Sequence, residues 1–151
     1  KDGGWFLENE ACKKNNIILV NLVARSRSAP EKEMIIETNK LFQKIKYPAL
    51  IHCKSGADRA GIVSALYKLL YCDQHPSIAK KELSIKFLHL KWAKTGILDK
   101  FISEYEKHYK KYKGSNFIDW VNNNYDPKKL EKEFKENKLI DKFLFRVLGR
   151  E

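Results

Sequence analysis

A cysteine and an arginine stand six positions apart, after a short apolar run and before an apolar helix pattern. Cys53 follows the apolar residues 49–51, Gly56 lies in the loop, and Arg59 opens the helix pattern. Unpaired N–H groups at a helix start bind tetrahedral oxyanions, and arginine can donate two parallel hydrogen bonds to such an anion. The same positive environment favours a cysteine thiolate. The spacing therefore predicts a phosphate-binding loop with Cys53 as nucleophile.

The alternative is a structural thiol and a surface charge. Free cysteine is often buried without any chemical role, and Arg59 would then be an ordinary solvated cation. His52 directly before the cysteine, Gly56 within the loop, and a strand pattern and a helix pattern on the expected sides favour the phosphate loop instead.

The sequence from His52 to Arg59, His-Cys-x5-Arg, resembles the signature of the cysteine-dependent protein tyrosine phosphatases, in its dual-specificity branch. Residues 52–61, 94–99 and 117–121 are similar to bacterial members of that branch, chiefly alphaproteobacterial ones. The resemblance covers most of the chain from about residue 17 onward. It implies a cytoplasmic bacterial hydrolase of phosphate monoesters that acts through a phosphocysteine and needs neither metal nor other cofactor.

The resemblance also implies a role for each loop residue. Cys53 would attack phosphorus, Arg59 and the backbone amides would hold the phosphate oxygens, and His52 would support the loop and help to keep Cys53 ionised. A lysine after the nucleophile, here Lys54, is a feature of lipid-directed branches. The expected phosphate-binding residues are Lys54, Ser55, Gly56, Ala57, Asp58 and Arg59.

The identity of the general acid is open. The family normally supplies an aspartate from an upstream loop, but this chain has no aspartate between Asp2 and Asp58. Asp58 matches an aspartate in the loop of myotubularin-like and some bacterial lipid-directed phosphatases, and its alternative role is a loop brace. Glu31 and Glu33 begin the preceding helix, whose positive end would favour their ionised forms and make them poorer acids.

Ala60 replaces the serine or threonine that most relatives place after the arginine. Loss of that hydroxyl predicts slow breakdown of the phosphocysteine. A phosphate-binding pseudophosphatase with weak turnover is therefore the alternative to an enzyme. Arg25 and Arg27 could bind substrate phosphate or be surface charges.

The net charge of +11 favours anionic partners: phosphorylated proteins, phosphoinositides, nucleic acid or an acidic membrane surface, and the expected substrate is a phosphorylated protein, a phospholipid or a small phosphate ester. Lysine supplies 25 of the 30 basic residues, and lysine spread over helices is usually a solvated surface, so no specific nucleic-acid partner is expected. Cys12 and Cys72 could form a protective disulfide with an oxidised Cys53. The sequence has no transmembrane or secretion-signal pattern, and it gives no indication of oligomeric state.

The hydrophobic pattern predicts a single α/β domain over residues 1–151. Its short parallel-type sheet, with strands at 17–24 and 49–53, would be flanked by helices. Further helices are expected at 6–15, 29–45 with a Ser28/Glu31 capping box, 59–70, 77–88, and from Thr95 to Gly114. Residues 115–151 would form a helical C-terminal extension, with an amphipathic stripe at 139–148. Since only two strands are evident, one interpretation is that the chain lacks the N-terminal part of the family domain.

Overall fold

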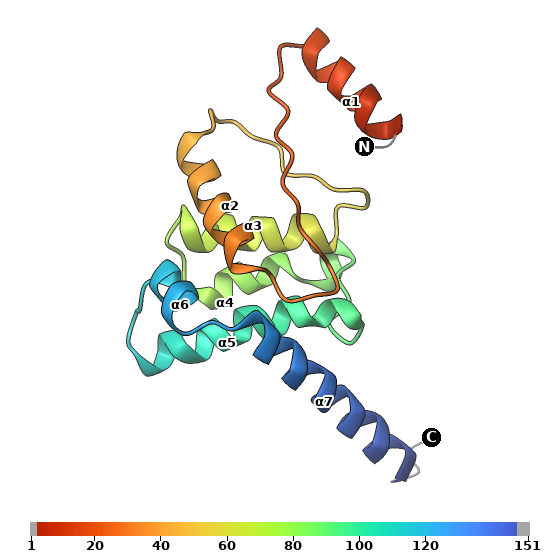
Figure 1. Cartoon of the computed structure of the whole chain (residues 1–151), viewed down its shortest axis with the longest axis vertical. Coiled ribbons are helices and arrows are strands. Elements are labelled where there is room, and N and C mark those ends of the chain that lie inside the picture. The colour runs from red at the N-terminus through yellow and green to blue at the C-terminus, as the bar shows by residue number, and fades with distance from the viewer. Residues whose placement is uncertain (1–2, 148–151) are drawn as a thin grey trace.

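The computed structural model describes residues 3–147, and it describes side chains as far as residue 139. Within these bounds the chain is helical and contains no strand (Figure 1). The amphipathic stripe predicted at 139–148 lies almost wholly outside the described side chains. In chain order the elements are α1 (Gly3–Lys14), α2 (Lys32–Lys44), α3 (Asp58–Leu70), α4 (Pro76–Ala79), the 3-10 turns η1 (Lys80–Glu82), η2 (Ile85–Phe87) and η3 (Lys94–Gly96), α5 (Ile97–Lys111), α6 (Phe117–Asn123) and α7 (Pro127–Val147).

The core is formed by α3, α4 and α5, with α4 packed against both α3 and α5, and with α2 and α6 at its sides. Apolar residues recur at helical spacing on α5, and Leu98, Phe101 and Ile102 on that face are fully buried. They form one cluster with Ile62 and Leu66 of α3. Figure 1 shows α2 to α6 gathered in one body, with α1 and α7 projecting from it at opposite ends. No helix of the described residues combines the length and hydropathy needed to cross a membrane.

The predicted α/β fold with a parallel sheet is wrong. Residues 17–25 and 49–53 run as irregular chain, and the βαβ unit expected from them does not form. Leu22, Ala24 and Ile51 pack against the helical core, but Val23 is 79% exposed and Leu50 is 86% exposed. The apolar runs predicted strands that are covered on both faces. Here each segment contributes only some of its side chains to the core.

Several helix boundaries also differ from the prediction. α2 begins at Lys32 after Glu31, whose side chain makes no capping bond, and the buried hydroxyl of Ser28 has no partner among the described residues. The helix predicted over 77–88 is replaced by α4 and two 3-10 turns. These end at Leu88, whose φ of 60° is left-handed. Left-handed backbone stops an α-helix, so the chain turns into a compact loop here.

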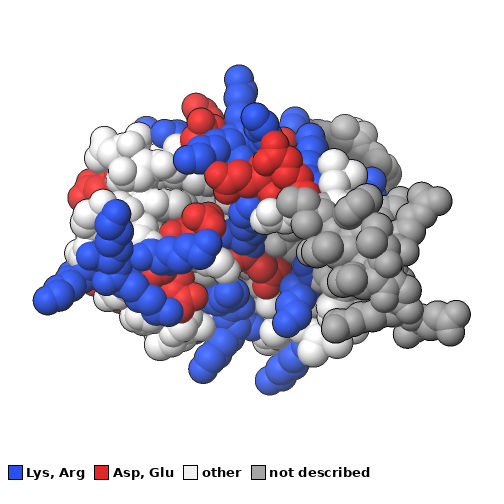
Figure 2. All heavy atoms as spheres, turned by 90° about the horizontal axis from the view of Figure 1, so that it is seen from below, with Lys and Arg blue, Asp and Glu red and all other residues white. Residues whose placement is uncertain are grey.

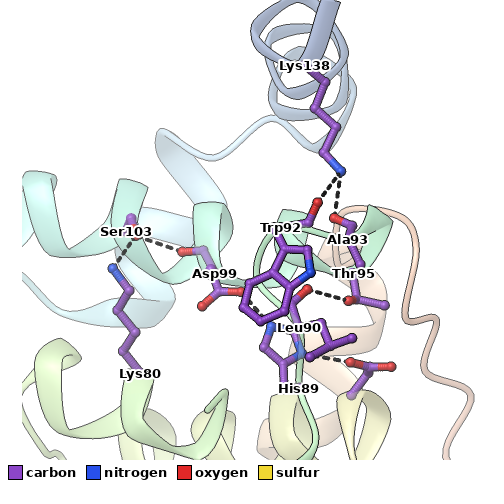
Figure 3. A network of polar contacts seen from close by, with 10 residues as sticks. Lys80, His89, Leu90, Trp92, Ala93, Thr95, Asp99, Ser103 and Lys138 are labelled. Carbon is purple, nitrogen blue, oxygen red and sulfur yellow. Dashed lines mark hydrogen bonds and ion pairs between the residues drawn. The ribbon is translucent and has the colours of Figure 1, made fainter. Parts of the chain in front are cut away.

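The loop at 88–96 joins η2 to α5 and carries His89. Thr95, expected to cap α5, instead donates its hydroxyl across the loop to the carbonyl of Leu90 at 3.1 Å. Gly96 is required by close approach, because a Cβ there would lie 1.8 Å from the carbonyl oxygen of Lys91. Lys138 of α7 donates to the carbonyl oxygens of Trp92 and Ala93 at 3.1 and 2.7 Å. The loop is thus fixed from inside and from α7 (Figure 3).

Candidate functional site

The predicted phosphate loop occupies residues 53–59 and leads directly into α3, which begins one residue earlier than expected, at Asp58. Gly56 has a φ of +70°, a conformation that residues with a Cβ adopt rarely. The first hydrogen bond of the helix runs from the N–H of Gly61 to the carbonyl of Ala57 at 2.7 Å. Ala57 has no side chain that could cap the helix, so the first N–H groups remain available to other acceptors.

The thiol of Cys53, which is partly exposed, lies in a backbone environment that acts on its pKa. Burial acts to raise the pKa of this thiol. The N–H groups of Ala60, Ser55 and Gly56 and the positive charge of Arg59 outweigh burial, and together they hold the pKa of Cys53 below its ordinary value. The loop therefore favours a thiolate, which is the nucleophilic form of cysteine.

The other predicted phosphate-binding side chains open to solvent. Lys54, Ser55 and Arg59 are exposed, whereas Ala57 is 5% exposed and anchors the loop in the core. An anion that enters from solvent and lies above Cys53 could contact the side chains of Lys54 and Arg59. The predicted set 53–59 thus comprises the loop and the first two residues of α3, and Lys54, Ser55, Gly56 and Arg59 of this set are exposed.

The Asp58 side chain does more than face solvent, because it contacts a histidine. Its Oδ1 lies 2.7 Å from Nδ1 of His89, and Nε2 of the same ring lies 2.5 Å from Oδ2 of Asp99 at the start of α5. The His89 side chain is 1% exposed, and that of Asp58 remains 25% exposed. Figure 3 shows the imidazole of His89 below Asp99 and beneath the other labelled residues of the loop at 88–96. Sequence reasoning missed His89, and it considered Asp99 only as part of a family-like segment.

His52, predicted to support the loop, contacts α1 in this structure. Its Nε2 lies 2.6 Å from Oε1 of Glu8, and both side chains are substantially exposed. This contact and the bond from Trp5 Nε1 to Asn21 Oδ1, at 2.8 Å, attach α1 to the remainder of the chain. α1 itself contributes no buried residue, and its apolar residues Phe6, Leu7 and Ala11 are exposed.

The chain just before the alternative acids, Glu31 and Glu33, is bonded to the C-terminal part of the protein. The N–H of Ala29 donates to Glu131 at 3.1 Å, and Tyr125 donates its hydroxyl to the carbonyl of Pro30 at 2.8 Å. These bonds tie the chain before Glu31 and Glu33 to the C-terminal helices. The carboxyl group that the structure places in the loop itself is Asp58.

Other expected contributors lie at the surface. Arg25 and Arg27 are exposed, and the three cysteines are free, with Cys12 partly exposed and Cys72 exposed. Among the described residues no group of three or more histidine, cysteine or acidic side chains could hold a metal ion. On the face shown in Figure 2, Lys and Arg alternate with Asp and Glu, which is typical of solvated helix surfaces.

The arrangement is a cysteine with a lowered pKa on the loop predicted to bind phosphate, together with an aspartate in contact with a buried histidine. Such a set could bind a phosphate group, attack it and donate a proton. No family model, curated protein or solved structure matches the chain. The functional assignment therefore depends on the chemistry of these residues.

Proposed function

We propose that this protein is a cysteine-dependent phosphatase that hydrolyses phosphate monoesters at the loop 53–59. The observation that carries the proposal is the set of N–H groups from Ala60, Ser55 and Gly56 around the Cys53 sulfur, with the Arg59 charge beside it. The same donors that favour a thiolate would favour the phosphate oxygens above it.

In the first step the Cys53 thiolate attacks phosphorus, and the S–P bond forms as the ester P–O bond breaks. The electron pair of the broken bond stays on the leaving oxygen, which takes a proton from the Asp58 carboxyl group. In the second step a water oxygen attacks phosphorus and gives a proton to the Asp58 carboxylate. The S–P bond breaks with its electrons returning to sulfur, so an alcohol and inorganic phosphate are released and the enzyme is restored.

The openness of the loop bears on the substrate class. Lys54, Ser55 and Arg59 are exposed, so the loop could accept a phosphate on a protein side chain, on a lipid headgroup or on a small ester. The proposed partners are therefore phosphorylated proteins, phospholipids and small phosphate esters.

The first test is phosphate release from nitrophenyl phosphate by the wild type and by Cys53→Ser. Loss of about three or more orders of magnitude in kcat is expected for Cys53→Ser, because serine at neutral pH is a far weaker nucleophile than a thiolate. Vanadate binding should persist in this variant, since the amides and Arg59 remain. A wild type that binds vanadate without releasing phosphate would instead be a phosphate-binding module, as the replacement of the usual hydroxyl by Ala60 would allow.

A further inference from the structure

Asp58 must hold a proton to act as the acid. It occupies the first position of α3 and directly precedes Arg59. A carboxylate without a proton has nothing to give to a leaving oxygen. The acid role proposed for Asp58 therefore needs a neighbouring group that keeps a proton at its carboxyl group.

The buried imidazole of His89 meets this need. Both of its ring nitrogens face carboxylate oxygens, at 2.7 Å from Asp58 and 2.5 Å from Asp99. Each nitrogen–oxygen pair at these distances needs one proton between its atoms, so the three side chains together hold two protons. The set is either an imidazolium between two carboxylates or a neutral imidazole with one carboxylic acid. In both cases a proton lies between Asp58 and His89.

The contact between His89 and Asp99 requires the second of these two protons. A neutral imidazole with Asp58 alone could satisfy its contact by donating from Nδ1, which leaves Asp58 ionised. With the Asp99 carboxylate on the other side, whose side chain is 16% exposed, Nε2 also carries or shares a proton. Transfer of the Nδ1 proton to Asp58 then leaves a neutral imidazole that still donates to Asp99.

We propose that His89 is a positioning residue of the acid step: backed by Asp99, it holds Asp58 at the start of α3 and supplies the proton that Asp58 passes to the leaving oxygen. This inference rests on the phosphatase function proposed above. The step is balanced, because the proton that leaves His89 is replaced through Asp58 when water gives up a proton in the hydrolysis of the phosphocysteine.

The test compares a good and a poor leaving group. Nitrophenolate leaves without help, whereas the serine alkoxide of O-phosphoserine requires a proton. For His89→Gln and Asp99→Asn we expect kcat on O-phosphoserine to fall by about 100-fold or more and kcat on nitrophenyl phosphate by less than about threefold, in the range typical of general acids. Vanadate affinity should remain within a factor of about three, since the anion loop is retained.

Two control experiments test whether His89 acts in the proton transfer or only supports the local fold. Lys138→Met removes the contacts of α7 to the Trp92 and Ala93 carbonyls and leaves His89 untouched, so both substrates should keep nearly the wild-type kcat. In an Asp58→Asn background, His89→Gln should produce no further loss on O-phosphoserine, because His89 acts through Asp58. Asp99→Asn is nearly isosteric and decides the question if His89→Gln does not fold.

The outcomes distinguish the two proposals. Equal losses on both substrates, or additive losses in the double variant, would overturn the role of His89 and leave the phosphatase standing. A wild type that hydrolyses neither ester would overturn the phosphatase and this inference together. Loss confined to O-phosphoserine supports both.

Discussion

Around the Cys53 sulfur, burial and hydrogen bonding act in opposite directions. Burial disfavours the thiolate, while the backbone N–H groups of Ala60, Ser55 and Gly56 and the charge of Arg59 favour it, so that the pKa of Cys53 lies below its ordinary value. The folded state therefore binds the thiol proton less tightly than the unfolded chain does. The resulting contribution to stability is present above the unfolded thiol pKa and is lost as the pH falls through the lower, folded pKa.

Alkylation rates should reveal this shift. As the pH is lowered from about 9 towards about 6, Cys53 should keep its reactivity with iodoacetamide longer than Cys72, an exposed cysteine that serves as the internal control. Peptide mapping by mass spectrometry would follow each site separately. Arg59→Met should narrow the difference, because it removes one of the groups that lower the Cys53 pKa. Identical pH profiles for the two cysteines would contradict the thiolate loop.

For single residues, the sequence pointed to the members of the loop 53–59 but not to His89, the buried partner of Asp58. Cys53, Gly56 and Arg59 are close in sequence, so their spacing alone predicted one loop. His89 lies 31 residues from Asp58, and a single histidine between two leucines has no pattern that assigns it to a site. Only the folding of the loop at 88–96 against the starts of α3 and α5 brings the two side chains together.

Among the structural elements, the loop at 88–96 is packed closely around one residue, Gly96. Gly96→Ala would place a Cβ 1.8 Å from the carbonyl oxygen of Lys91, and backbone rather than a flexible side chain would have to move. We expect this substitution to lower the free energy of unfolding by about 1–3 kcal/mol, the usual range for overpacking. Urea unfolding followed by circular dichroism measures the change.

Gly3→Ala is the matched control, since nothing lies within 4 Å of a Cβ at that position. Its free energy of unfolding should equal or slightly exceed that of the wild type, because alanine favours helix over glycine. If Gly96→Ala were equally harmless, the loop at 88–96 would not have the close packing described for it.

The helices with strong apolar periodicity were the elements best predicted from sequence. α3 and α5 lie within the helices predicted over 59–70 and from Thr95 to Gly114, give or take one residue, and they bury Ile62 and Leu66 on α3 and Leu98 and Phe101 on α5. The strands were mispredicted because an apolar β-branched run indicates only a local preference. A sheet also requires paired neighbours and cover on both faces, and neither is encoded within the run itself.

The molecule as a whole takes its stability from the body formed by α2 to α6. Phe101 is completely buried and contacts Phe117, Trp120 and Tyr125 from the C-terminal part of the body. Phe101→Ala should therefore lower the free energy of unfolding by about 3–5 kcal/mol, through lost burial and a residual cavity. Thermal and urea unfolding would both report it.

Leu7→Ala on α1 provides the comparison. Leu7 is 76% exposed, so its truncation should change the free energy of unfolding by less than about 0.5 kcal/mol. A large effect at Leu7 would mean that α1 belongs to the cooperative core, contrary to its lack of buried residues.

The irregular segment at 17–25 has a consequence for solubility. Ile17, Ile18, Val20 and Val23 are exposed on a β-branched run, which is the composition of segments that template intermolecular sheets. Lys13 and Lys14 precede this run, and Arg25 and Arg27 follow it. Stacking of identical segments would bring these like charges together, so the flanking cations would oppose aggregation, most effectively at low salt.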